Sequence, residues 1–255
     1  MNKRTICVLS IVITLIFSSY VFGQEKTPPA KADFMRVLPP SSRVMIGGLA
    51  KSFDVKILAA QIKDTSSTAY GFTTGISEEK GSFKLGVLMA DLEATIRAND
   101  REKVSKAVRA LSDGLSQLGA TLPLIISVTN LSAAINSGVD LQAVNRASLP
   151  LIRPFVEDFI SKEGKMNYFR FGEWVEATRL ATLTGEQGKV KPAVDFIIGV
   201  NMADYFLIEF KDKNLPKGVI DSLKGIAALE KAKEIGEKEV RATRKAIDTI
   251  FEIMG

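Results

Sequence analysis

Apolar side chains recur at three- and four-residue spacing along most of the chain, and this period constrains the fold more than any other feature. The clearest example is formed by Val104, Val108, Leu111, Leu115 and Leu118. That spacing places the five side chains on one face of an α-helix. No segment shows the strict apolar–polar alternation, bounded by hairpin turns, that is typical of strands. The sequence therefore predicts an all-α protein.

Short polar connections separate the helical stretches. Gly119 stops one helix, and Pro123 suits the first turn of the next. Pro150 and Pro154 must kink or split the helix that contains them. Short connections favour antiparallel neighbours, so we expect an antiparallel helical bundle of about seven to nine helices. Residues 41–255 are predicted to form this single helical domain.

Three further segments carry specific expectations. A helix is predicted from Arg43 to about Lys63. Residues 64–82 are rich in Ser, Thr and Gly, which is typical of a long surface loop. Pro192 lies in the first turn of a strongly apolar stretch, which is expected to be one helix reaching Phe210.

Two segments resemble each other enough to suggest an internal duplication. Residues 83–111 and 169–197 share six identities when aligned without gaps, and Gly86 is aligned with Gly172. In a duplicated helical hairpin, these glycines would let two helices approach closely. The alternative is two unrelated amphipathic hairpins, and the alignment leaves both interpretations open.

Residues 1–23 have the layout of a secretory signal peptide. Lys3 and Arg4 precede an uninterrupted apolar run, and Gly23 is the small residue before the cut if cleavage precedes Gln24. Retention as an uncleaved anchor is the alternative, because the segment is just long enough to span a bilayer. In both cases the rest of the chain crosses the membrane, which predicts a periplasmic or extracellular protein.

Residues 24–40 contain four prolines and no apolar period, which predicts a Pro-rich linker or tether. Residues 1–23 contain two basic and no acidic side chains, so their removal lowers the net charge from +5 to +3. Such a mild charge is not typical of a nucleic-acid-binding domain. The chain is 46% apolar and 25% charged, which excludes multi-pass membrane insertion.

The chain contains no histidine, and its single cysteine is Cys7. This composition excludes several chemistries. Cleavage of the signal would leave a chain without imidazole or thiol. Ser-His-Asp and Cys-His nucleophiles, zinc sites with Cys or His ligands and thiol redox motifs are then excluded. The nucleotide motifs G-x-x-x-x-G-K-[ST] and G-x-G-x-x-G are absent. No cofactor or metal is predicted, although carboxylate chemistry, a Ser-Lys pair and oxygen-ligated cations stay open.

Glu173 and Glu176 are the best candidates for carboxylate chemistry. They lie three residues apart on one helix face, and Arg179 follows Glu176 at the same interval. Paired carboxylates can act as acid and base or ligate a hard cation. The alternative, which we prefer, is a solvated face with an internal ion pair, because the polar flanks give no sign of burial. Asp91 is likewise expected at the polar edge of its helix rather than buried with a partner.

Aromatic residues supply the candidates for ligand or partner contact. Trp174 is expected to be a core anchor, with ligand stacking as the alternative, and Arg179 joins it as a candidate ligand-binding residue. Tyr70 and Phe72 lie in the predicted loop, where exposed aromatic side chains suit partner or ligand contact. They could equally fold back to close the bundle.

Taken together, these features favour a non-enzymatic, exported helical scaffold that binds a protein partner or an apolar small molecule. The apolar face of the C-terminal helix would pack on the bundle or on a second subunit, so a homo-oligomer is also considered. One alternative is an enzyme or hard-cation-binding protein that uses Glu173 and Glu176. Another is a structural cell-envelope component. A scaffold predicts an exposed apolar groove, whereas a small-molecule carrier predicts a closed apolar cavity near Trp174.

Overall fold

The computed structural model describes residues 39–62, 71–72, 75–232 and 234–255. The predicted signal peptide with its cleavage site, and all of the predicted linker except its last two prolines, lie outside these residues. The helices are α2 (Ser42–Ser52), α3 (Val55–Ala60), α4 (Glu78–Arg97), α5 (Arg101–Gln117), α6 (Leu122–Asn136), α7 (Leu141–Ala143), the π-helical turn η1 (Val144–Ser148), α8 (Leu149–Lys162), α9 (Met166–Glu186), α10 (Val190–Val200), α11 (Ala203–Glu209), α12 (Lys217–Glu230) and α13 (Glu237–Met254).

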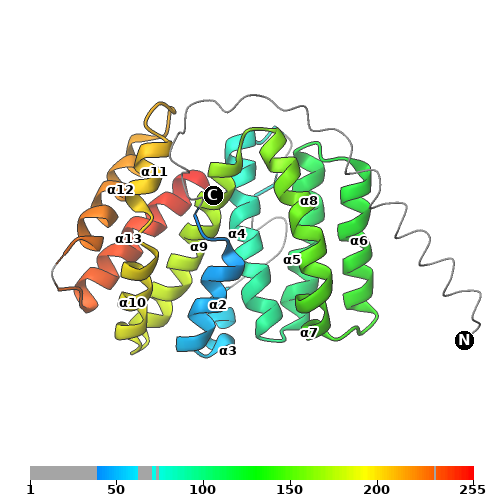
Figure 1. Ribbon diagram of the computed structural model, residues 1–255, viewed down its shortest axis with the longest axis horizontal. Helices are drawn as coiled ribbons and strands as arrows, with labels where there is room; N and C mark the ends of the chain where they lie inside the picture. The colour runs from blue at the N-terminus through cyan, green and yellow to red at the C-terminus, as the bar shows by residue number, and fades with distance from the viewer. Residues whose placement is uncertain (1–38, 63–70, 73–74, 233) are drawn as a thin grey trace, which may run out of the picture. The chain divides into compact units, whose positions relative to one another are not determined.

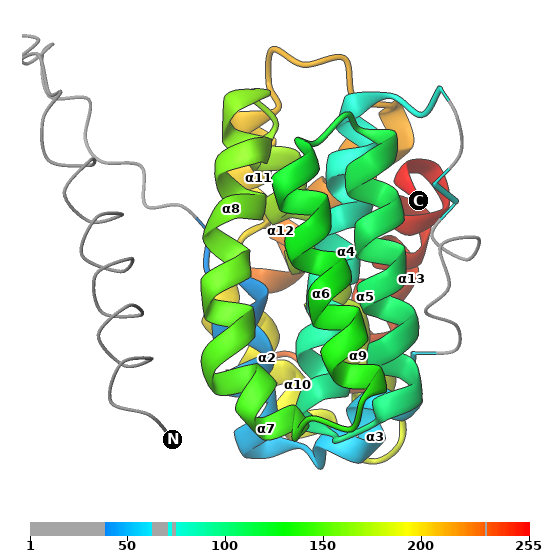
Figure 2. The same cartoon turned by 90° about the vertical axis from the view of Figure 1, so that its right-hand side faces the viewer.

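The predicted all-α bundle is confirmed, and no strand occurs among the described residues. Helices α4 and α9 run side by side through the middle (Figure 1). Helices α5, α6 and α8 lie on one side of this pair, and α10, α12 and α13 lie on the other. Helix α6 is at the front of its side, flanked by α5 and α8 (Figure 2). None of the described helices combines the length and hydropathy that a bilayer span requires.

Helices α4 and α9 cross at two glycines that leave no room for a side chain. A Cβ atom on Gly86 would lie 2.0 Å from the carbonyl oxygen of Phe169, and a Cβ on Gly172 would lie 1.9 Å from that of Phe83. The two contacts are reciprocal, because Gly86 meets Phe169 and Gly172 meets Phe83, while the repeat alignment pairs Gly86 with Gly172 and Phe83 with Phe169. The backbones approach this closely because both positions lack a side chain.

The two aligned segments also have the same helix pairing. Helix α5 packs on α4 in the first segment, and α10 packs on α9 in the second. Each segment is therefore a helical hairpin whose first helix contributes a glycine to the central crossing. Both interpretations of the alignment, a duplicated hairpin and two unrelated amphipathic hairpins, place a helix pair in each segment.

The helix expected from Arg43 to Lys63 is interrupted, which corrects that prediction. Phe53 has extended backbone angles, and Asp54 then accepts a hydrogen bond of 2.8 Å from the amide of Lys56 at the start of α3. A side chain that caps the first turn favours the start of a new helix. The signal for this break is the aspartate that follows Phe53.

The surface loop predicted over residues 64–82 is wrong at its C-terminal end. Helix α4 begins at Glu78, and the Ser77 hydroxyl accepts a hydrogen bond from the amide of Lys80. The polar residues of the first turn belong to the helix because Ser77 caps it and two glutamates lie near its positive end.

Two long helical stretches contain breaks. The single helix expected from Pro192 to Phe210 is wrong, because Asn201 adopts φ 27° and separates α10 from α11. The disturbance expected around Pro150 and Pro154 is present as the π-helical turn η1 directly before α8, and Pro154 itself lies inside α8. Such a turn is one way in which a helix accommodates a missing backbone hydrogen bond.

Candidate functional site

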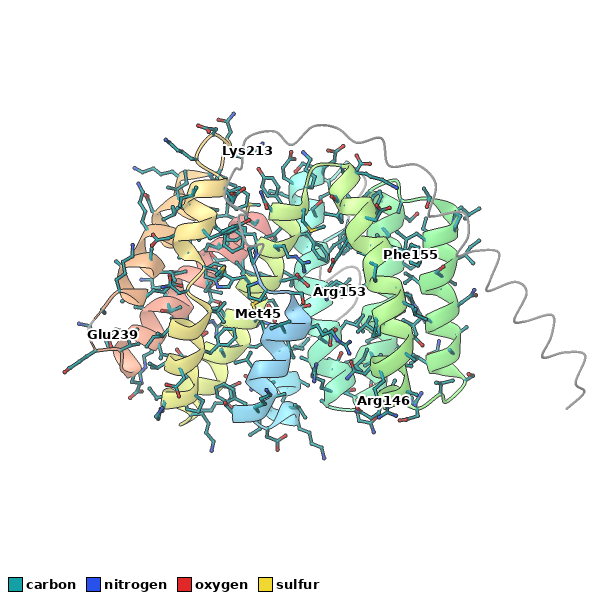
Figure 3. All side chains as sticks on the ribbon, in the orientation of Figure 1. Met45, Arg146, Arg153, Phe155, Lys213 and Glu239 are labelled. Carbon is teal, nitrogen blue, oxygen red and sulfur yellow. The ribbon has the colours of Figure 1, made fainter. Side chains whose placement is uncertain are left out.

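Glu173 lies at the centre of a buried ionic cluster. Its side chain is 0% exposed, and its Oε1 accepts hydrogen bonds from the backbone amide and the hydroxyl of Ser42, at 3.1 and 2.6 Å. Arg153 also donates to Oε1, and Arg170 donates to Oε2 at 2.7 Å. Figure 3 labels Arg153 where α8 meets α2. Both carboxylate oxygens are therefore fully used inside the protein.

Glu157 completes the charge balance around the two buried arginines. Its Oε1 accepts a hydrogen bond of 2.6 Å from Arg153, and its Oε2 lies 3.1 Å from a guanidinium nitrogen of Arg170. Glu157 and Glu173 together provide two negative charges for two positive ones. A buried charge is tolerated when it is paired and hydrogen-bonded in this way.

Glu93 on α4 extends the cluster through Arg43 of α2. Its side chain is 0% exposed, and it lies 3.6 Å from Arg43 and 3.8 Å from Arg97 without making a hydrogen bond. Burial raises the pKa of this carboxyl, against the lowering effect of the two arginines. Arg43 also donates to the backbone carbonyl of Asn145 at 3.2 Å, which ties α2 to η1.

Glu176 forms a second buried ion pair. Both of its oxygens accept hydrogen bonds of 2.6 Å from Arg179, whose guanidinium also lies 5.6 Å from the centre of the Phe251 ring. The ion pair expected from the spacing is present, but the solvated face is wrong, because Glu176 is 0% exposed. Asp91 is 3% exposed, so its placement at a polar edge is also wrong.

The structure therefore does not bring Glu173 and Glu176 together in a cleft. Arginines occupy the oxygens of each carboxylate, and neither glutamate lines the groove beside Phe155 or the two pockets beside Tyr168 and Arg101. Within the described residues, no group of three or more acidic, histidine or cysteine side chains could hold a metal ion. Glu173 joins α9 to α2 and α8, whereas Glu176 is paired with an arginine of its own helix.

Trp174 is part of an aromatic core cluster. Its ring lies 6.0 Å from that of Phe171 and 5.3 Å from that of Phe206, and its side chain is 2% exposed. Phe171 and Phe210 make a further contact at 5.3 Å. Neighbouring rings fill the space around Trp174, which is the core role expected for it.

Phe72, one of the two aromatic candidates of the predicted loop, folds back on the bundle, as one of its two interpretations predicts. Phe72 packs against the core, with ring atoms 2.7 Å from where a Cβ of Gly114 would stand. The ammonium of Lys84 donates to the carbonyl of Gly71 at 3.1 Å. Tyr70 lies outside the described residues. Phe72 is therefore a packing residue, held by a glycine on α5 and a lysine on α4.

A different surface carries exposed apolar side chains. Nine large apolar side chains are exposed among the described residues, and four of them lie on α6 and α8. Leu122 and Ile126 are on α6, and Leu151 and Phe155 are on α8, with exposed fractions from 48% to 69%. Soluble proteins seldom gather such side chains unless the patch is used for binding.

A groove of about 260 Å³ lies between α6 and α8 within this surface. Pro123, Leu124, Phe155 and Phe159 provide its apolar wall, while Asp158 and Lys162 stand at its polar edge, with Thr121 and Ser127. Figure 3 shows Phe155 on α8 beside α6. We call this groove, together with the exposed residues Leu122, Ile126, Leu151 and Phe155, the α6–α8 surface.

Sequence reasoning missed this surface, although a signal for it is present. Helix α6 has no charged residue in fifteen positions, LPLIISVTNLSAAIN, so its outward face cannot be highly polar. Only the fold shows which of its apolar residues stay exposed, because the helix is apolar on most sides. Two partners of Glu173, Ser42 and Arg153, were missed as well because they are far from it in sequence. Arg170 lies three residues before Glu173, a spacing that indicates an ion pair on one helix.

Glu230, at the end of α12, is a buried acid with an unusual titration. Burial raises its pKa to about 7, and the neighbouring charge of Asp204 adds to this effect. Its Oε2 makes no hydrogen bond. The salt bridge of 2.6 Å between Lys231 and Asp204 closes the same junction between α12 and α11.

Glu230→Gln is expected to stabilise the protein at pH 8 but not at pH 5. The unfolded chain releases this proton near pH 4.5, whereas the folded chain keeps it until about pH 7. The stability that the protonated group contributes is complete below pH 4.5 and is lost as the pH rises through 7. Thermal melts should show a midpoint several degrees higher than wild type at pH 8. An equal shift at both pH values would contradict this assignment.

In comparisons with protein-family models, curated proteins and solved structures, no family, relative or structural neighbour matches this chain. The functional argument therefore depends on the amino-acid sequence and on the geometry of the described residues.

Proposed function

We propose that this chain is an exported, non-enzymatic helical scaffold that binds a protein partner through the α6–α8 surface. The observation that carries the proposal is the concentration of exposed apolar side chains around the groove between α6 and α8. An exposed apolar groove is the feature that distinguishes a binding scaffold from a carrier with a closed cavity.

The buried acids and aromatic residues support this proposal indirectly. The two candidate catalytic glutamates are paired with arginines, and Trp174 is packed among other rings. Export is proposed from the n-region, apolar run and small residue before Gln24 in the sequence. After cleavage before Gln24 the chain would contain no cysteine, so no disulfide could form at the α6–α8 surface.

Site-specific photo-crosslinking in the host tests the proposal. A photoreactive amino acid placed at Phe155 or Ile126 is expected to give a discrete crosslinked adduct, because both side chains are exposed on the α6–α8 surface. The same amino acid at Lys224 is the control, since this residue is exposed on α12, at the other end of the molecule in Figure 1. Mass spectrometry of the adduct reports both the partner and whether the chain begins at Gln24.

The outcomes separate clearly. Adducts at Phe155 and Ile126 but not at Lys224 support a binding surface at α6 and α8. Absence of adducts at all three positions, or equal labelling at all three, would overturn the proposal. A chain recovered from the cytosol would overturn its export.

A further inference from the structure

Helix α6 has an outward face that carries no charge. It contains fifteen residues without Asp, Glu, Lys or Arg, and its buried side chains are Leu124, Val128, Leu131 and Ile135. A helix on the surface of a soluble protein normally places charged residues opposite its buried side. In α6, that opposite side carries apolar and small neutral residues instead.

Side-chain size changes along this outward face. Leu122 and Ile126, which are large, lie in the first half, whereas Ala133 and Ser137 lie in the last turns and at the C-cap. All four residues are exposed. The spacing 122, 126, 133 and 137 follows one side of an α-helix. Between the two halves lie Thr129 and Asn130, which are polar but uncharged.

We propose that α6 pairs antiparallel with α6 of a second copy of this chain, so that the partner of the α6–α8 surface is the chain itself. The inference rests on the proposed function, because it takes this surface as a binding site. In an antiparallel pair centred on Thr129 and Asn130, Ile126 of each copy lies opposite Ala133 of the other, and Leu122 lies opposite Ser137. Large side chains then meet small ones in both halves of the contact, and Thr129 and Asn130 meet at its centre.

The absence of charge favours a second copy as the occupant. At a two-fold axis a residue meets its own copy, so a charge close to the axis would face a like charge. The residues nearest the axis in this pair, Thr129 and Asn130, are uncharged. A partner selected by charge would instead need a complementary charged face, which α6 does not offer. Leu151 and Phe155 on α8 would extend the apolar contact beside the paired helices.

Light scattering on the purified full-length chain tests self-association. We expect a dimer for the wild type, and at least a tenfold weaker dimer for Ile126→Lys, because the lysine would be buried against Ala133 of the other copy. The matched control is Val44→Lys, which replaces an apolar side chain of 64% exposure on α2. This variant is expected to dimerise like the wild type. Ile126 is 48% exposed, so its replacement leaves the core intact.

Engineered cysteines test the direction of the pairing in a Cys7→Ser background. Asn130→Cys at the centre is expected to form a disulfide with its own copy. An Ile126→Cys chain is expected to form a disulfide only with an Ala133→Cys chain. Two copies of position 126 would lie about 10 Å apart along an antiparallel pair. Disulfides require Cα atoms closer than about 7 Å. Tags of different size on the two variant chains distinguish the mixed disulfide-linked dimer from dimers of a single variant.

Each outcome decides the inference. Disulfides at Asn130→Cys and in the mixed pair support it. A monomer at all concentrations, or a disulfide between two Ile126→Cys chains without the mixed product, overturns it. A monomer that still gives photo-crosslinked adducts of another protein at Ile126 removes the second copy but keeps the proposed function. A monomer without any adduct removes both.

Discussion

Gly86→Ala is expected to lower the free energy of unfolding by about 3 kcal/mol or more. The added methyl group would lie 2.0 Å from the carbonyl oxygen of Phe169 and 2.9 Å from the backbone nitrogen of Glu173. These atoms belong to a helix backbone, so they cannot move aside as a flexible side chain can. The two central helices must separate, and the packing around their crossing is lost with that movement.

Denaturant unfolding of the variant and of a matched control measures this effect. Gly225→Ala in α12 is the control, because no atom lies within 4 Å of the added methyl group. Alanine there should stabilise the helix by about 0.5–1 kcal/mol relative to glycine. Gly172→Ala should resemble Gly86→Ala, since its contact with Phe83 is the reciprocal one. Stability equal to wild type in Gly86→Ala would contradict the close crossing.

Glu173→Gln is expected to lower the free energy of unfolding by about 3–5 kcal/mol, the usual effect of removing one partner from a buried ion pair. The change keeps the shape of the side chain but removes its charge. Arg153 and Arg170 would then share the charge of Glu157 alone. The hydrogen bonds that hold Ser42 at the start of α2 would also weaken.

Asp195→Asn is the matched control for the loss of one acidic charge. Asp195 forms an exposed ion pair with Lys191 on α10, and such pairs contribute between about 0 and 1 kcal/mol. Denaturant unfolding should therefore separate the two variants clearly. A Glu173→Gln protein as stable as Asp195→Asn would show that the buried cluster is not important for stability. Hydrogen exchange in α2 gives a second readout, because weaker anchoring of Ser42 should increase exchange there.

Helical periodicity predicted the architecture well, and it failed where a single residue interrupts a continuous pattern. The stripe from Val104 to Leu118 predicted α5 correctly because the helical period is a local pattern, whichever helices its apolar face then packs against. The apolar stretch ending at Phe210 looked like one helix, yet Asn201 divides it. Period alone cannot detect such a break, because the residues on either side continue to bury apolar surface.

The candidate site was predictable only in part. The pairing of Glu176 with Arg179 follows from their spacing on one helix, and the structure confirms it. The burial of that pair, however, depends on helices that are distant in sequence, such as α13, which supplies Phe251. The exposure of Leu122 and Phe155 depends in the same way on which helices leave α6 and α8 uncovered.

The amino-acid sequence by itself determined that this chain is helical, where α5 ends and α6 begins, and which nucleophiles and soft metal ligands it lacks. Local periodicity, caps and composition act within a few residues, so they can be read along the chain. Only the tertiary structure decided that Glu173 is a buried anchor and that the neutral face of α6 is exposed. Burial and exposure are set by which helix faces meet, and in this protein those faces are more than a hundred residues apart where α2 contacts α9.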